Sequence, residues 1–218
     1  MKIQWLGHSS FLITSNAGVR IVTDPYQPGG FDGAIKYGAL TNPVDIVTVS
    51  HEHTDHNYVA MVTGRPIVVK GAGRYVVSGI EFQGVQTMHD TSGGAERGKN
   101  TVFTFAVDGV KLCHLGDLGH VLNQDQAAEI GSVDVMFVPV GGFFTIGPEE
   151  AGKVAEQLAA KIVIPMHFKT EKIDFPIVGV DDFLKDKQNV KRLDNSTIEL
   201  RKEDIPQERQ IIVFRHEL

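Results

Sequence analysis

The chain of 218 residues is poor in cysteine, in long apolar runs and in excess positive charge. Its single cysteine, Cys113, excludes an intrachain disulfide framework and favours a reducing compartment. Residues 1–8 lack the apolar core of a signal peptide, so we expect a cytoplasmic protein. The longest strongly apolar stretch, residues 133–140, is far shorter than the roughly 20 residues that cross a bilayer. We therefore expect no membrane partner.

The net charge of the chain indicates which kinds of partner it can bind. The chain has 27 acidic and 21 basic side chains, a formal net charge of −6, whereas a general nucleic-acid binder usually has a basic face. Nucleic acid is thus an unlikely partner, although local basic patches remain compatible with this balance. No linker or low-complexity segment interrupts the chain, so residues 1–218 are expected to form one domain. The expected partner is a small-molecule substrate, and the sequence assigns no oligomeric state.

Strand patterns dominate the first half. Short β-branched runs predict strands over residues 2–6, 10–14, 19–23, 45–50 and 66–69. A long Gly/Pro-rich loop is expected over residues 24–43, and a short helix over residues 57–62. Residues 80–88 predict one more strand, which leads into the second half.

The second half repeats this order. Residues 103–117 resemble 11–24, residues 132–139 resemble 43–50, and residues 161–164 resemble 66–69. Two such halves would pair their sheets face to face, with helices outside. An amphipathic helix from Pro148, with the apolar stripe Ala151, Val154, Ala155, Leu158 and Ala159, fits an outer layer, as does a second helix opened by a capping box at residues 123–126. The fold class is α/β.

The densest chemistry lies in His51-x-His53-x-Asp55-His56, directly after a predicted buried strand. Residues i and i+2 of a strand face the same way, so His51 and His53 can present two imidazoles to one point. After the turn, Asp55 and His56 offer a carboxylate and an imidazole to a second point. These groups suit Zn²⁺. The alternative is a polar strand-to-helix loop with Asp55 as the N-cap.

Four more ligand-type side chains follow predicted strands, where active-site residues of layered α/β folds tend to lie. They are His8, His89, Asp117 and His167.

Taken together, these stretches resemble the metallo-β-lactamase-fold hydrolases, and most of all the small single-domain branch that includes ascorbate-phosphate lactonase-like proteins. The stretches that match are residues 6–10, 22–25, 49–56, 89, 115–117, 139–142, 145–151 and 164–167. The resemblance implies a four-layer αββα sandwich. It also implies one metal ion on His51, His53 and His89, a second on Asp55, His56 and His167, and Asp117 bridging both.

The implied cofactor is Zn²⁺, two ions per chain, with Mn²⁺ or Fe²⁺ also compatible. Two divalent ions roughly 3.5–4 Å apart would hold a bridging hydroxide for attack on an ester, lactone or phosphoester. Asp55 and Asp117 would act in catalysis by balancing the metal charge. Two other readings remain: a metal-dependent phosphodiesterase or nuclease of the same superfamily, and a metal-binding sensor without turnover.

Several other residues keep two interpretations each. His8 and Asp24 either orient ligands or serve the local chain, and Asp90 either orients His89 or faces solvent. His120 and Lys169 either reach the substrate or face solvent. His114 is expected to be structural and His216 exposed. Tyr26, Phe143 and Lys169 are expected near the pocket. The segment after Thr170 contains no assignable motif.

Overall fold

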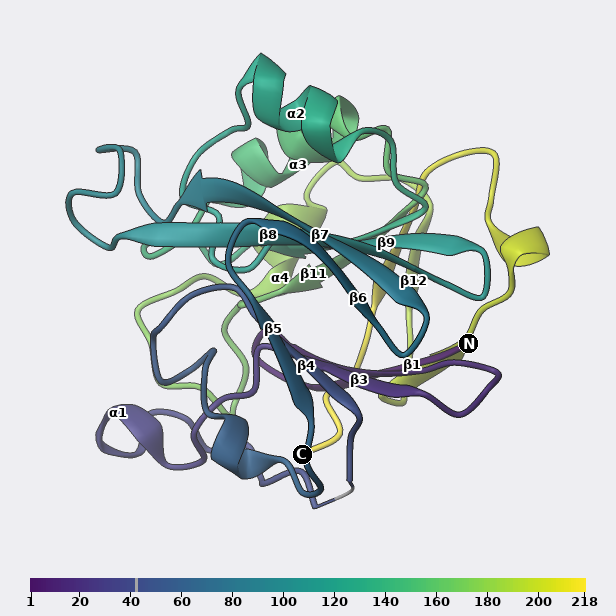
Figure 1. The fold of residues 1–218 in the computed structure, drawn as a ribbon. Coiled ribbons are helices and arrows are strands. Elements are labelled where there is room, and N and C mark those ends of the chain that lie inside the picture. Colours follow the sequence, from purple (N-terminus) through teal and green to yellow (C-terminus); the bar gives the residue numbers. More distant parts are fainter. Residues whose placement is uncertain (42) are drawn as a thin grey trace.

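Two β-sheets form the frame of the molecule (Figure 1). The computed structural model describes residues 1–41 and 43–218; the expected loop 24–43 therefore includes one residue, Asn42, outside the described residues. The first sheet has the order β13-β1-β2-β3-β4-β5 and the second the order β12-β14-β11-β10-β9-β8-β7-β6.

The strands of the first sheet are β1 (Lys2–Gly7), β2 (Ser10–Thr14), β3 (Arg20–Thr23), β4 (Ile46–Val49), β5 (Ile67–Lys70) and β13 (Thr197–Glu199). Those of the second are β6 (Gly73–Val77), β7 (Ile80–Met88), β8 (Lys99–Val107), β9 (Val110–His114), β10 (Val135–Pro139), β11 (Ile162–Met166), β12 (Val190–Arg192) and β14 (Gln210–Val213). The helices are α1 (Gly30–Gly33), α2 (Gln124–Ile130), α3 (Pro148–Gln157) and α4 (Val180–Leu184), with 3-10 turns η1 (Val59–Met61) and η2 (Lys202–Asp204).

The pairing pattern confirms the two similar halves. In the first sheet β1-β2-β3 pair antiparallel, and β3-β4-β5 then pair parallel. In the second, β7-β8-β9 pair antiparallel, and β9-β10-β11 then pair parallel. The equivalences predicted from the sequence match: β8 and β9 correspond to β2 and β3, β10 to β4, and β11 to β5.

The inner faces of the two sheets pack directly on each other. Phe11 of β2 contacts Phe137 of β10 with ring centroids 4.4 Å apart, and both side chains are fully buried. Cys113 of β9 belongs to the same core. Burial of these aromatic and β-branched side chains is the main force that holds the two halves together.

The two outer layers differ. Helices α2 and α3 lie on the second sheet (Figure 1), and α4 packs on α3. Helix α3 buries Ala151, Val154 and Ala155 as predicted. Ala159 does not continue this stripe, because the chain there has left the helix with a positive φ of 46° and the side chain is exposed. Asn123 forms the expected capping box of α2.

Over the first sheet the covering layer is mostly irregular. Its core contains Tyr26, Ile35 and Tyr37 from the expected loop and Ile173 and Phe175 from beyond β11. The expected helix over residues 57–62 is a single 3-10 turn, η1. No helix in the described part of the chain is long and apolar enough to cross a membrane.

Candidate metal centre

Loops from both sheets meet at one edge of the sandwich. His51, His53, Asp55 and His56 follow β4 of the first sheet, whereas His89, Asp117 and His167 follow β7, β9 and β11 of the second. The structure thus brings all seven predicted ligands together from segments distant in sequence. Except for His53, which is exposed, their side chains are buried.

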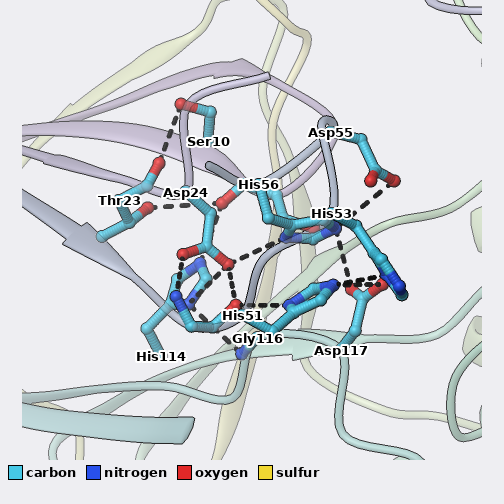
Figure 2. Close-up of polar contacts among 12 residues, drawn as sticks. Ser10, Thr23, Asp24, His51, His53, Asp55, His56, His114, Gly116 and Asp117 are labelled. Atoms are coloured by element: carbon cyan, nitrogen blue, oxygen red, sulfur yellow. Dashed lines mark hydrogen bonds and ion pairs between the residues drawn. The ribbon is translucent and has the colours of Figure 1, made fainter. Parts of the chain in front are cut away.

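His51, His53 and His89 form the first group. One ligand-type nitrogen of each lies within 4.8 Å of the other two. His51 Nε2 and His53 Nδ1 are 3.0 Å apart, so two ring nitrogens point at the same small space (Figure 2). This is the trio that the family resemblance implied for the first ion.

Asp55, His56 and His167 form the second group, and the structure adds His8 to it. Asp55 Oδ2 lies 3.5 Å from His56 Nε2 and 3.2 Å from His8 Nε2. His8 is fully enclosed, with its ring 4.2 Å from that of His167. His8 therefore contacts predicted ligands directly, which favours the orienting role over a purely local one.

Asp117 lies between the two groups. Its Oδ2 is 3.2 Å from His89 Nε2 and 3.4 Å from His167 Nε2, and its Oδ1 is 3.2 Å from His56 Nε2. A single carboxylate thus reaches side chains of both groups. Asn100 holds this carboxylate's chain segment in place, since its Oδ1 accepts the backbone N–H of Asp117.

Several buried polar atoms of the centre lack a hydrogen-bond partner, although such atoms are normally paired. They are His8 Nδ1, Asp55 Oδ1, His56 Nε2, His89 Nδ1, Asp117 Oδ1 and His167 Nδ1. Two of these atoms, His56 Nε2 and Asp117 Oδ1, lie 3.2 Å apart at the centre, and imidazole nitrogens beside carboxylate oxygens fit divalent metal ions of the zinc type. The donor set therefore agrees with the implied cofactor.

Burial lowers the pKa of two histidines of the first group, His51 and His53. It lowers the pKa of His51 to about 3, so this imidazole is neutral and able to donate a lone pair. In the second group, interactions between carboxylates and histidines outweigh the effect of burial on the pKa values. Burial alone would lower the pKa of His56, but the carboxylates of Asp117 and Asp55 raise it well above its usual value. Burial likewise opposes the charge of Asp117, but His167 and His56 hold its pKa well below the usual range.

Asp24 orients histidines of both groups. Its Oδ2 accepts a hydrogen bond from His56 Nδ1 at 2.9 Å (Figure 2). It also accepts one from Ser50 Oγ at 2.5 Å, and Ser50 Oγ contacts His51 Nδ1 at 2.9 Å. These contacts leave Nε2 of both rings directed at the centre. The orienting interpretation of Asp24 is therefore supported over the purely local one.

The chain before Asp117 passes very close to β4. A Cβ added to Gly116 would lie 2.4 Å from Asn100 Oδ1 and 2.5 Å from Ser50 Cβ. Gly116 also has a φ of +55°, which favours glycine. This close approach lets the loop after β9 reach the loop after β4, and so joins the two sheets at the centre.

Three of the remaining candidates have structural contacts. His120 Nε2 accepts the N–H of Met88, and its Nδ1 lies 2.8 Å from Val121 O. Lys169 Nζ donates to Phe175 O at 3.0 Å and pairs with Asp174. His114 is buried and contacts Ser9 O, as expected for a structural histidine.

Asp90 and His216 differ from expectation. Asp90 neither contacts His89 through its side chain nor faces solvent, because its carboxylate accepts four backbone N–H groups of residues 92–97. These N–H groups lower the pKa of Asp90 to about 2. His216 is not exposed, since its ring packs on Trp5 and its Nε2 contacts Glu171 Oε1 at 2.9 Å.

A cavity of about 210 Å³ opens over the two groups. Its walls are Phe31, Phe144, Phe175 and Arg97, and its floor is His53, Asp55, His89, Asp117 and His167. The four wall residues are not among those expected from the sequence, which are Tyr26, Phe143 and Lys169. Tyr26 is buried in the outer core, and Phe143 points to solvent while its neighbour Phe144 lines the cavity. A Gly-Gly-Phe-Phe sequence after a strand was the available signal, but spacing could not show which ring turns inward.

With two sheets, outer helices and a His/Asp centre at one sheet edge, the protein has the architecture of a metal-dependent hydrolase of the metallo-β-lactamase superfamily. The family model described as "Beta-lactamase superfamily domain" matches residues 2–167, and the chain belongs to this family.

Individual relatives agree with this assignment. The chain is 32% identical over 194 residues to a UPF0173 metal-dependent hydrolase of Methanoculleus marisnigri, covering 78% of this chain and 82% of the relative. It is also similar to the crystal structure of a candidate Zn-dependent hydrolase from Thermotoga maritima, with 42% identity, 99% of each chain covered and a TM-score of 0.82.

A more distant structure shares the fold alone. The isothiocyanate hydrolase from Delia radicum gut bacteria is 14% identical, with 92% of this chain and 99% of that chain covered and a TM-score of 0.65. The chain is accordingly a metal-dependent hydrolase, as expected from the sequence.

Proposed function

We propose that this protein is a dinuclear hydrolase, with two Zn²⁺ ions as its cofactor, that cleaves an ester, lactone or phosphoester bond of a small molecule. The observation that supports two ions is the position of Asp117, whose carboxylate reaches histidines of both groups. A mononuclear site would need only one of these groups.

When bound, the ions supply Lewis acidity and lower the pKa of a water molecule toward about 7. The chain supplies orientation and charge balance. Asp24 fixes the rings of His56 and His51, so the centre is preorganised before substrate enters. Asp55 and Asp117 place two negative charges among the histidines, which would offset half of the positive charge of two divalent ions.

The size of the cavity supports a small substrate. About 210 Å³ walled by three phenylalanines can enclose part of a small molecule and exclude bulk water from the centre. We further propose that the protein works in the cytoplasm, since its one cysteine is a buried thiol.

A phosphodiesterase is the second candidate, supported by one observation. A groove beside His51 and His53 contains three basic side chains, Lys70, Arg97 and Lys99. Lys70 is paired with Glu52, which reduces the positive charge available to a phosphate chain. The balance therefore favours small esters and lactones.

An activity panel on metal-loaded protein tests the proposal. Aryl esters, lactones, bis(4-nitrophenyl) phosphate, anilides and a penicillin would be compared before and after chelation. We expect an ester or lactone to be hydrolysed only with metal present, and penicillin to be a poor substrate because fold does not determine function. Turnover of the phosphodiester alone would favour the second candidate, and full metal occupancy with no turnover of any compound would favour a sensor.

A further inference from the structure

We propose that Arg97 binds an anionic group of the substrate, and that Phe31, Phe144 and Phe175 enclose an apolar segment between this group and the metal centre. The inference rests on the proposed hydrolase function and specifies its substrate class: an ester or lactone with an apolar body and a remote carboxylate or phosphate.

The three rings form one wall although they come from three separate segments. Phe175 contacts both of the others, with ring centroids 5.3 Å from Phe31 and 5.6 Å from Phe144 and nearly perpendicular planes. Edge-to-face packing of this kind gives a defined apolar surface. Its opposite side is the floor of histidines and aspartates, so a substrate with its reactive bond at the floor would lay its adjoining atoms on these rings.

Phe31 lines this wall although its backbone conformation and its exposure to water are both unfavourable for phenylalanine. It is half exposed and has a positive φ of 52° inside α1, a conformation that is uncommon for a bulky side chain. An exposed aromatic ring that is fixed in an unfavourable backbone conformation is stabilised when apolar atoms cover it and remove it from water. A substrate in the cavity would provide this cover.

Arg97 is the one cationic side chain among the described residues that line the cavity. Its guanidinium lies over the ring of Phe144, 5.8 Å from the centroid, so it borders the apolar wall. Among the described residues its one ion pair is with the exposed Glu96, at 3.5 Å, and Glu96 also accepts a shorter hydrogen bond from Ser92 Oγ. Since a guanidinium has five N–H donors, this contact leaves enough of them to bind a carboxylate or phosphate in a bidentate manner.

The backbone of Arg97 is fixed relative to the centre. Asp90, the residue after His89, accepts the backbone N–H of Arg97 at 2.8 Å together with those of Ser92, Gly94 and Glu96. One carboxylate thus ties the loop of Arg97 to the end of β7. Because its position is fixed, Arg97 can select substrates by the distance between the reactive bond and the anionic group.

The charges around the cavity favour a substrate whose remote group is an anion over one whose remote group is a cation. Asp55 and Asp117 serve the metal ions, whereas Arg97 lies on the wall and lacks a strong acidic partner among the described residues. The Arg97 side chain is partly buried, with 31% of its surface exposed, so its guanidinium gains from an anionic ligand, and the more exposed Glu96 can be displaced at little cost.

Charged and neutral esters of equal length test this directly. Metal-loaded wild type and Arg97→Gln would be given 4-nitrophenyl hemiesters of adipic and suberic acid, each beside the neutral 4-nitrophenyl ester of the same chain length. We expect Arg97→Gln to lower kcat/KM for the hemiesters by about tenfold to a hundredfold, the value of a charged hydrogen bond, and to leave the neutral esters within about twofold. Arg97→Lys should retain part of the preference.

Arg74→Gln is the matched control, because Arg74 is also paired with one exposed glutamate, Glu81, but lies on β6 away from the cavity. It should leave the preference for the hemiesters unchanged. Equal kcat/KM for charged and neutral esters in wild type, or an equal loss for both in Arg97→Gln, would overturn the inference.

A binding measurement separates this inference from the proposed function. Calorimetry would compare 4-phenylbutanoate, 4-phenylbutyl phosphate and the neutral 4-phenylbutanamide on metal-loaded wild type and Arg97→Gln. Tighter binding of an anion, lost in Arg97→Gln, supports the inference even if no ester is hydrolysed, and the stronger anion identifies carboxylate or phosphate. Anion binding that is equal in both proteins would mean that the metal ions alone bind it, and would overturn the inference.

Discussion

Asp117 and Asp24 are both buried carboxylates, but they have different tasks in the centre. Asp117 faces the Nε2 atoms of His56, His89 and His167, whereas Asp24 lies behind the rings and contacts His56 Nδ1. Removal of charge at these two positions should therefore have distinct effects on metal content.

Replacing Asp117 with asparagine keeps the side-chain size and removes the charge between the two groups. We expect Asp117→Asn to lose at least one ion and several orders of magnitude of activity while the fold remains, because a neutral amide is a weak ligand for two dications. Elemental analysis and circular dichroism measure both effects.

Asp125→Asn makes the same chemical change at an exposed site in the first turn of α2 and serves as the control. Two ions per chain and near-normal turnover in Asp117→Asn would show that the dinuclear assignment is wrong.

Replacing Asp24 with asparagine should weaken metal binding without abolishing it. An amide cannot accept from His56 Nδ1 and Ser50 Oγ as strongly as a carboxylate, so the rings lose orientation. We expect metal affinity to fall by roughly 10–100-fold, typical for loss of a residue that orients a ligand. Competition with a chromogenic chelator measures it; unchanged affinity would assign Asp24 to local structure only.

At the scale of elements, the site depends on strand ends that approach closely. The spacing His51-x-His53-x-Asp55-His56 and the strands before it could be predicted, because period-two alternation and β-branched runs are local signals. The partners of these residues depended on the family resemblance, since local patterns show that Asp117 follows a strand but not which strands lie beside it. The cavity wall could not be predicted, because Phe31 and Phe175 lie in irregular segments whose conformation depends on tertiary packing.

Gly116 permits one of these close approaches, between the chain after β9 and the chain after β4. Gly116→Ala would place a Cβ 2.5 Å from Ser50 Cβ at a positive φ, so β9 and β4 would have to separate. We expect a loss of about 1–3 kcal/mol in the free energy of unfolding, as for an overpacked core, in metal-free protein measured with urea.

The control is Gly109→Ala, in the turn between β8 and β9. Gly109 has a similar positive φ of 80°, but nothing lies within 4 Å of the added Cβ. It should show the backbone penalty alone, and equal losses in the two variants would contradict the packing explanation.

At the scale of the whole molecule, the repeated strand order was visible in the sequence and is confirmed by the sheet pairing. The tail after Thr170 was not interpretable, because its strands are short and exchange between sheets: β13 extends the first sheet, whereas β12 and β14 extend the second. Strands of three residues give too short a pattern to be recognised.

The pKa and reactivity of the Cys113 thiol test whether the interior of the folded protein excludes water. Burial raises the pKa of its thiol to about 12, whereas an unfolded thiol has a value of 9.0. The folded state thus keeps the proton longer, so this thiol's contribution to stability is present below about pH 9 and is lost as pH rises toward 12.

We expect a disulfide reagent to label native protein only as fast as it unfolds, and the free energy of unfolding to fall from pH 8 to pH 10 less steeply in Cys113→Ala. Rapid labelling of native protein at pH 8 would contradict the burial of Cys113.

The division of the ligands between two sheets has a thermodynamic consequence. Unfolding separates the ligand side chains after β4 from those after β7, β9 and β11. Bound ions would therefore hold the two halves of the folded chain together. Ions that bind only the folded chain raise its stability by about 2.7 kcal/mol at a free concentration 100 times Kd. Melting curves with Zn²⁺, Mn²⁺ and Fe²⁺ should therefore rank the metals before any substrate is known, and chelation should make the protein more sensitive to proteases.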